Sequence, residues 1–516
     1  MNKFKLCLII SFFLFLSAAV TTAQNNTNEN EYLYSEAIEV YQQEIEKEVV
    51  SHSLAENYCA QFRGNNCSGV APAGAHPPVS LVPEESLVWK TEIASGVSSP
   101  CVWENSVFLT GYEPYDRLLV TYCINKESGA ILWEKSVWPD SIEPVHAVGS
   151  PAAATPVADG KHVYVYFGSY GVVCYDFEGN LVWGKKLPIP ESDYGSCGSP
   201  VVANNILLVN RLNELLALDK ETGETIYTAN ITGSQATPVI RGNEILLHQY
   251  LGLKSINIDD GSENWNLSIV TLGNSTPVLS NNMLFVNGFT NIGETRLYDK
   301  LPEFNVILSL ADHNADGLIQ ISEIPDSLAL FRRPELDLPF PDDTMYSWQK
   351  VAPNFDFTKD DAMNETEWKQ MKGYWEKYML EHGVVAIKLP ENETQKPELI
   401  WKESNYIAEI PSLLCNGNQV YMISNGGLVT CMNTGTGEVI YREKLGAPGA
   451  YLASPLLANG HIYFVSYNGK ITVVKPDENL NVISQCNLKE KIAASPVAAD
   501  NQLLVRSTEA LYAFGK

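Results

Sequence analysis

Two acidic twelve-residue stretches carry the residues whose types and spacing most clearly predict chemistry. The first, residues 312–323, places oxygen-bearing side chains at positions 1, 3, 5, 9 and 12 and glycine at position 6. Calcium takes six to eight oxygen ligands, and this spacing lets one loop supply most of them. The predicted ligands are Asp312, Asn314, Asp316, the carbonyl of Leu318, Gln320 and a bidentate Glu323. Gly317 permits the sharp turn that such a loop requires.

A second stretch with the same spacing begins 44 residues later, at Asp356. Asp361 occupies its sixth position, where the motif has glycine, so we expect weaker calcium binding there. Both stretches fit the EF-hand loop, and EF-hands normally occur in pairs. We therefore predict an EF-hand pair in which Ile319 and Met363 face one another. The predicted ligands of the second loop are Asp356, Thr358, Asp360, the carbonyl of Ala362, Asn364 and Glu367.

Helices must hold these loops in place. The pattern predicts one helix entering the first loop over residues 303–310, another leaving after Glu323, and a third over 365–381. Trp368, Met371 and Trp375 lie near helical spacing in the third helix. We interpret them as the core of the pair, with a target-binding groove as the alternative. A second alternative is an EF-hand fold that no longer holds metal.

The rest of the chain is organised by a repeat of about 40 residues. Residues 198–231 read as four short strands, because the aliphatic runs are too brief for helices and a glycine turn separates the last two. Each copy ends in a strand with aliphatic residues before an aromatic, such as Leu181, Val182 and Trp183. These aromatics are predicted to fill the space between neighbouring copies. A Ser/Thr-Pro step begins the copies at Ser99, Thr155, Ser199, Thr237, Thr276, Ser454 and Ser495, and an altered step stands at 410–412.

Four strands per repeat indicate the blade of a β-propeller, and the count gives eight blades. The last copy ends after three strands, whereas residues 87–93 carry an isolated fourth-strand signature. We therefore predict an all-β fold: an eight-bladed β-propeller closed by an N-terminal strand, with a small α-helical EF-hand insertion. Closure of the ring leaves only short, protected edges.

The predicted domain organisation follows from the repeat. Residues 1–23 have the charged start, apolar core and small-residue cleavage site of a signal peptide. Residues 24–85 form an N-terminal arm that is helical in part. Residues 86–288 hold blades 1–4, the start of blade 5 and the closing strand of blade 8, and 384–516 hold the remainder. Thr276 and Ser412 lie 136 residues apart where one blade needs about 40, so 289–383 are predicted to be the EF-hand insertion.

Composition restricts the partners and the compartment. The formal net charge of −26 argues against nucleic acid or an anionic membrane surface as a partner. The signal peptide and the lack of another long apolar run predict an exported protein without a membrane span, periplasmic or secreted. Of the cysteines left after cleavage, Cys59 and Cys67 flank a short loop and are candidates for a disulfide. Most of the others are predicted to be small buried hydrophobic residues.

Residues Gln61, Phe62, Arg63 and Gly64 resemble the opening that precedes the first blade in secreted propellers of the quinoprotein-like superfamily, named after pyrroloquinoline quinone (PQQ). In those proteins the opening packs against the ring, which implies a structural role here. Together with the repeats in 86–288 and 384–516, the resemblance implies the PQQ-like propeller fold. The superfamily includes PQQ-dependent alcohol dehydrogenases and the non-enzymatic assembly lipoprotein BamB, so the fold alone does not specify a function.

No catalytic residues can be assigned from the sequence. The dehydrogenases of this superfamily use two adjacent cysteines over PQQ, and this chain has no such pair. The histidines, including His146, His248 and His461, follow no metal or triad spacing. We predict an exported, non-catalytic binding or scaffold protein that holds Ca²⁺ and meets a protein or glycan on a propeller face. The alternatives are a PQQ-dependent alcohol-type dehydrogenase and a BamB-like envelope assembly factor.

Overall fold

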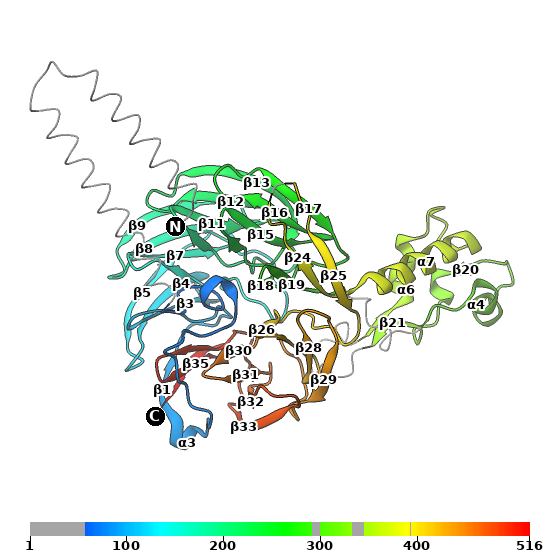
Figure 1. Cartoon of the computed structure of the whole chain (residues 1–516). Helices are drawn as coiled ribbons and strands as arrows, with labels where there is room; N and C mark the ends of the chain where they lie inside the picture. Colours follow the sequence, from blue (N-terminus) through cyan, green and yellow to red (C-terminus); the bar gives the residue numbers. More distant parts are fainter. Residues whose placement is uncertain (1–56, 291–299, 333–344, 393, 516) are drawn as a thin grey trace, which may run out of the picture. The chain divides into compact units, whose positions relative to one another are not determined.

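A computed structural model describes residues 57–290, 300–332, 345–392 and 394–515, and within these ranges the chain forms eight four-stranded antiparallel sheets (Figure 1). These sheets are the blades of the predicted propeller. The predicted signal peptide, and the part of the N-terminal arm before residue 57, lie outside the described residues. No helix in the described ranges is long and apolar enough to cross a bilayer.

The first four blades are continuous in sequence. Blade 1 is β2 (Cys101–Trp103), β3 (Ser106–Glu113), β4 (Leu118–Asn125) and β5 (Ile131–Val137). Blade 2 is β6 (Val157–Ala158), β7 (His162–Phe167), β8 (Gly171–Asp176) and β9 (Leu181–Lys186). Blade 3 is β10 (Val201–Ala203), β11 (Ile206–Asn210), β12 (Leu212–Asp219) and β13 (Thr225–Ser234). Blade 4 is β14 (Val239–Arg241), β15 (Glu244–Gln249), β16 (Gly252–Asn257) and β17 (Glu263–Ser268).

The last four blades include the two discontinuous ones. Blade 5 is β18 (Val278–Ser280), β19 (Met283–Gly288), β24 (Gly383–Lys388) and β25 (Glu398–Glu403). Blade 6 is β26 (Leu414–Asn416), β27 (Gln419–Ser424), β28 (Leu428–Asn433) and β29 (Val439–Lys444). Blade 7 is β30 (Leu456–Ala458), β31 (His461–Val465), β32 (Lys470–Lys475) and β33 (Asn481–Asn487). Blade 8 is β34 (Val497–Ala499), β35 (Gln502–Arg506), β36 (Ala510–Phe514) and β1 (Leu87–Glu92).

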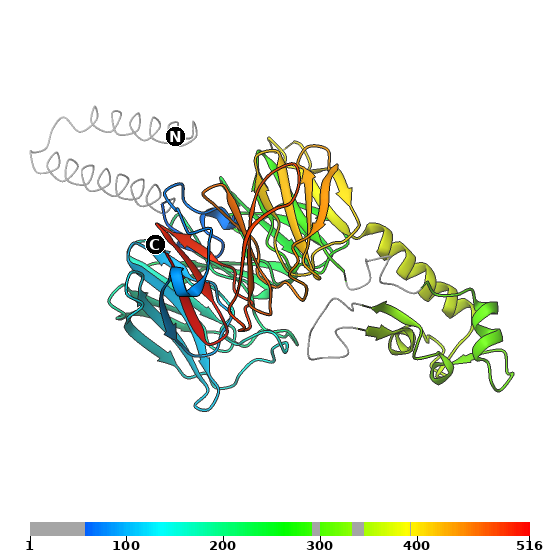
Figure 2. The same cartoon turned by 90° about the horizontal axis from the view of Figure 1, so that it is seen from below.

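The N-terminal strand closes the ring, as predicted. Strand β1 pairs antiparallel with β36, so that Lys90 lies opposite Tyr512 and Thr91 opposite Leu511. The first and last parts of the propeller are therefore side by side (Figure 2). Without this pairing β36 would expose a free edge, which is the usual hazard of an open sheet.

A closed circuit of hydrogen bonds joins the blades at their first strands. At each blade start a Ser or Thr hydroxyl accepts the backbone N–H of the equivalent residue in the preceding blade, at 2.9–3.1 Å. Ser412 takes its place in the circuit although its proline precedes rather than follows it, so the altered copy is functionally intact. In donor-to-acceptor order the circuit runs Ser99, Thr155, Ser199, Thr237, Thr276, Ser412, Ser454, Ser495 and back to Ser99.

The outer strands dock onto the next blade through an aromatic ring and a glycine. The ring of Trp89 lies where a Cβ on Gly129 would be 2.6 Å away, so only glycine fits at this turn of blade 1. The ring nitrogen or hydroxyl also donates to a carbonyl of the same turn at 2.8–2.9 Å. The prediction that these aromatics fill inter-blade space is confirmed. The docked pairs are Trp89 with Gly129, Trp133 with Gly179, Trp183 with Gly223, Tyr227 with Gly261, and Trp401 with Gly437.

The opening segment 57–86 contacts the inner strands of several blades and contains η1 (Asn65–Cys67) and α3 (Pro83–Ser86). The carbonyl of Cys59 accepts the N–H of Val102, and Asn66 exchanges two hydrogen bonds with Ile240. Arg63 is buried and donates to the carbonyl of Leu413 at 2.6 Å. The structural role expected for this opening is therefore observed.

The candidate disulfide is absent, because Cys59 and Cys67 are both buried free thiols. The thiol of Cys59 lies beside the carbonyl of Ala498 in blade 8, whereas that of Cys67 lies beside Pro238 at the start of blade 4. The ring contacts of the backbone thus direct the two side chains to different blades. Burial also raises the pKa of both thiols to about 12, which disfavours the reactive thiolate. Cys197, in contrast, is exposed.

The chain between β19 and β24 forms a small helical module with its own core. Its elements are α4 (Phe304–Ala311), β20 (Ile319–Gln320), η2 (Ile321–Glu323), β21 (Ala329–Arg332), β22 (Met345–Ser347), α6 (Trp348–Val351), η3 (Ala352–Asn354), β23 (Ala362–Met363) and α7 (Glu365–Glu381). Phe304, Ile307, Trp348, Trp368 and Met371 are among the residues buried together. Trp368 and Met371 are therefore core residues of the module, as predicted.

One predicted helix of this module is wrong. A helix was expected to leave the first loop after Glu323, but the chain makes only the single 3-10 turn η2 and then becomes extended at Ile324. Pro325 explains the difference, because a proline disfavours helical geometry in the residue before it. The entering helix was predicted over 303–310 and is observed as α4.

Candidate metal centre

The first acidic loop is closed by its own backbone N–H groups. Asp312 accepts hydrogen bonds from the N–H groups of Asp316 and Gly317 at 3.2 and 3.0 Å. Glu323, at the far end, accepts from the N–H of His313 and of Gln320 at 3.0 and 3.1 Å. The two terminal carboxylates of the loop are thus held toward the same turn of chain. Gly317 has a φ of +83°, which a residue with a Cβ rarely adopts.

Inside this loop the polar side chains converge on Asp316. Asn314 and Gln320 each donate a side-chain hydrogen bond to its Oδ2, at 2.9 and 2.7 Å. The N–H of Leu318 donates to Oδ1, and this bond is the main cause that lowers the pKa of Asp316 below its usual value. The carboxylate is therefore ionised and exposed, as a cation ligand must be.

The second loop has the same construction around Asp356 and Glu367. Asp356 accepts from the N–H groups of Lys359 and Asp361 at 2.6 and 3.0 Å. Glu367 accepts from Phe357, Thr358 and Asn364 at 2.9–3.0 Å, and from the hydroxyl of Thr358 at 3.1 Å. Burial alone would raise the pKa of Glu367, but these hydrogen bonds outweigh it and hold the pKa below its usual value.

Asp361 adopts the left-handed conformation that the sixth position requires, with a φ of +61°. An Asp tolerates this region better than most residues, although at a cost that glycine avoids. The backbone of the second loop therefore follows the course of the first despite the substitution.

A short two-stranded sheet joins the two loops. Ile319 lies opposite Met363, and Gln320 opposite Ala362, in the β20–β23 pair. Both Ile319 and Met363 are fully buried in the module core. The carbonyls of Leu318 and Ala362, predicted as ligands, precede or begin these strands. The two loops are thus fixed back to back by the residues that the sequence predicted to face one another.

The donor set of the two loops fits calcium in its chemistry. The predicted ligands Asp312, Asn314, Asp316, Leu318, Gln320 and Glu323 offer only oxygen to a cation, as do Asp356, Thr358, Asp360, Ala362, Asn364 and Glu367. In the described residues, however, no three His, Cys, Asp or Glu side chains are gathered as a metal cluster. The carboxylates instead face N–H donors of their own loop, so a cation would have to draw the oxygens together.

Two functional features were not evident from the sequence. His382, at the return of the module to blade 5, accepts the N–H of Thr290 on its Nδ1 at 2.9 Å and so ties the two connections together. Burial, assisted by Lys402, lowers the pKa of His382 to about 3. Glu143 is buried against Gly168, accepts the hydroxyl of Ser196 at 2.8 Å, and has its pKa raised to about 7 by burial. Neither residue belongs to a motif, and only their three-dimensional neighbours distinguish them.

Comparison with known proteins relates the propeller, not the insertion, to a family. Residues 116–292 and 394–482, just over half of the chain, match the family model "Outer membrane protein assembly factor BamB". The match stops near the end of β19 and resumes after β24, so it omits the module with the acidic loops. No curated protein matches the sequence significantly.

Solved structures share the fold at low identity. BamB from Moraxella catarrhalis has a TM-score of 0.50 and 10% identity, over 84% of this chain and 99% of that chain. A europium-containing methanol dehydrogenase has a TM-score of 0.53 and 10% identity, over 89% of this chain and 98% of that chain. An assembly factor and an enzyme are similar to this chain to the same degree, so the fold does not choose between them.

Proposed function

Because the chain belongs to the BamB-like family of PQQ-like β-propellers, we propose that it is an exported, non-catalytic binding or scaffold protein that holds calcium in its insertion. The observation that carries the calcium proposal is the pairing of two acidic loops through Ile319 and Met363. Two independent loops with this spacing, fixed back to back, are the arrangement in which EF-hands bind calcium.

In this proposal the residues of each loop have distinct tasks. Asp312, Asp316 and Glu323 bind the cation in the first loop together with Asn314, Gln320 and the carbonyl of Leu318. Asp356, Asp360 and Glu367 do so in the second, with Thr358, Asn364 and the carbonyl of Ala362. Bound calcium supplies the positive charge that offsets the repulsion among these exposed carboxylates. The N–H groups that now hold the carboxylates keep the loop closed while the oxygens turn inward.

We propose that calcium has a structural role and that it orders the insertion. Exported proteins meet high calcium, where an affinity of about 10⁻⁴–10⁻³ M suffices. The module core is small, and its two loops concentrate negative charge at one side of it. A propeller face then remains for a protein or glycan partner. Membership of the BamB family favours a second candidate, in which that partner belongs to the machinery of outer-membrane protein assembly.

Calorimetry tests the calcium proposal on the full chain. We expect a saturable calcium isotherm after removal of metal with EDTA, and a melting temperature that rises with calcium concentration by mass action. A flat isotherm together with unchanged thermal unfolding would overturn it.

Reconstitution tests the non-catalytic proposal. After addition of PQQ and Ca²⁺, we expect neither an absorbance shift of the quinone nor dye-linked oxidation of alcohols. Turnover would replace the proposal by the dehydrogenase alternative. A pull-down from envelope extract distinguishes the two binding candidates, because enrichment of outer-membrane assembly proteins is expected only from the second.

A further inference from the structure

The junction between blades 6 and 7 departs from the docking pattern of the other blades. Its aromatic residue, Tyr441, faces the turn 476–480, and this turn has no glycine. In the described chain Tyr441 makes no hydrogen bond to that turn, whereas the docked aromatics each donate to a turn carbonyl. The turn is held instead by Gln419, whose Nε2 lies 3.5 Å from the carbonyl of Asp477. The two blades are therefore less tightly joined here.

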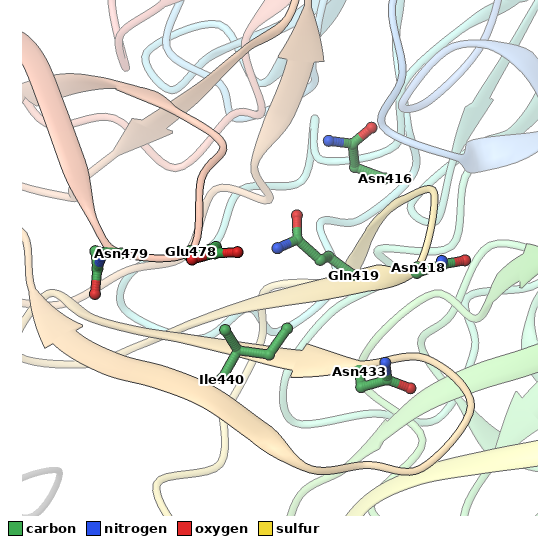
Figure 3. Close-up of a pocket in the computed structure, with 7 residues that line it drawn as sticks. All are labelled: Asn416, Asn418, Gln419, Asn433, Ile440, Glu478 and Asn479. Carbon is green, nitrogen blue, oxygen red and sulfur yellow. The ribbon is translucent and has the colours of Figure 1, made fainter.

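A cavity of about 640 Å³ occupies this junction (Figure 3). Its walls come from both blades, and the side chains of Gln419 and Glu478 reach toward one another across it. Within the described residues, the side chains of Asn416, Asn418, Glu478 and Asn479 have no hydrogen-bond partner in the protein. The lining residues are Asn416, Asn418, Gln419, Asn433, Ile440, Glu478 and Asn479.

The lining has an unusual composition, with amides as the main group. Each free amide presents a donor and an acceptor side by side, which matches a ligand with alternating donors and acceptors. The lining contains no cation and one carboxylate, Glu478, so an anionic ligand is disfavoured. Ile440 is the only apolar side chain in the lining, and it offers too little surface for an apolar ligand.

We propose that this cavity is a binding site for a neutral, polyhydroxylated ligand, that is, a short neutral saccharide. Vicinal hydroxyls satisfy the paired donors and acceptors of Asn416, Asn479 and Gln419. Glu478 accepts from a further hydroxyl, and Ile440 contacts the C–H face of the sugar. The site goes beyond the proposed function, because blades 6 and 7 hold no part of the acidic loops.

Saturation-transfer NMR on the full chain tests the site with a panel of neutral mono- and disaccharides, a uronic acid and a neutral tripeptide. We expect transfer to a neutral saccharide and weaker transfer to the uronic acid, which Glu478 repels. Asn416→Ala and Asn479→Ala should each weaken affinity by about 3- to 10-fold, the effect of losing one or two hydrogen bonds. Asn230→Ala is the matched control, since it removes an exposed amide from blade 3 and should leave binding unchanged.

Three results would overturn the proposal: no transfer to any saccharide, transfer that both cavity variants leave intact, or preferential transfer to the tripeptide. Each measurement is made in calcium and in EDTA. Saccharide binding that persists in EDTA separates this site from the calcium proposal, so the failure of one does not decide the other.

Discussion

The propeller and its insertion hold their loops by different means. In the propeller each loop is held by a neighbouring blade, through neutral hydrogen bonds of the Ser/Thr circuit and through aromatic rings docked on glycines. In the insertion each acidic loop is held by its own N–H groups and by one short sheet contact to the other loop. Propeller stability therefore comes from repetition, whereas the insertion has few neighbours and an excess of negative charge.

The carboxylates sharpen this contrast. Glu143 is buried in the propeller beside Ser196 and has a raised pKa, so it is stable there as the neutral acid. Asp316 and Glu367 in the insertion have lowered pKa values because N–H groups donate to them. A carboxyl that keeps its proton needs no cation, while a cluster of ionised carboxylates does. The difference implies that calcium should affect one region and pH the other.

The largest effect should come from removing the centre of the insertion core. Trp368 is fully buried and donates its ring N–H to the carbonyl of Pro302 at 2.8 Å. Trp368→Ala should destabilise the insertion by about 3–5 kcal/mol and unfold it, while the propeller remains folded. Hydrogen exchange should show lost protection in α4 and α7 alone. Trp138→Ala, at an exposed propeller tryptophan, is the control, and simultaneous loss of both regions in Trp368→Ala would contradict the separation.

The next effect concerns pH and the propeller. Burial raises the pKa of Glu143 to about 7, above its ordinary value of 4.5. The stabilising contribution of the neutral acid is complete below about pH 4.5 and is lost as pH rises through 7, by up to about 3 kcal/mol. Glu143→Gln should remove this component from the pH dependence of urea unfolding. Identical pH profiles for the two proteins would contradict the assignment.

Blade docking should have an intermediate effect. A Cβ on Gly129 would meet the ring of Trp89, whereas one on Gly242 would meet nothing within 4 Å, and both glycines have positive φ. Gly129→Ala and Gly242→Ala therefore share the backbone strain and differ in the clash. We expect the first to be less stable than the second by about 1–3 kcal/mol in urea unfolding. Equal losses would mean that the ring does not need this glycine.

The smallest effect distinguishes the two acidic loops. Asp361→Gly should relieve strain at a φ of +61° and tighten calcium binding to the second loop by about 2- to 5-fold, equivalent to about 0.4–1 kcal/mol. Asp361→Ala is the control, because it removes the same charge without relieving the strain. Calorimetry with the first loop inactivated by Glu323→Gln measures the second loop alone. Equal affinities of the two variants would assign the effect to charge.

Local patterns in the sequence predicted much of the architecture. The strand signature at 87–93 predicted the closing strand because it is a fragment of the repeat unit. The two acidic loops were predicted from ligand spacing, and Ile319 and Met363 from their positions within it. These features depend on residues within one short stretch, so periodicity and spacing reveal them.

The remaining features depend on neighbours far apart in the chain. The circuit bond between Ser495 and Ser99 joins residues 396 positions apart, and no local pattern predicts it. Cys59 and Cys67 are close in sequence, but their contacts with different blades separate the thiols. The helix expected after Glu323 was an error of local interpretation, since Pro325 was already visible. The cavity between blades 6 and 7 arises from a glycine that is missing at a contact known only from the fold.

Hydrogen exchange of the full chain in calcium and in EDTA tests the central claim, that calcium orders the insertion and not the propeller. We predict slower exchange in calcium for the amides of 312–323 and 356–367 and for β20 and β23, with no change in β3 or β11. Glu323→Gln should abolish the protection of the first loop. Identical exchange of the insertion in calcium and in EDTA, or equal protection of propeller and insertion, would contradict the account.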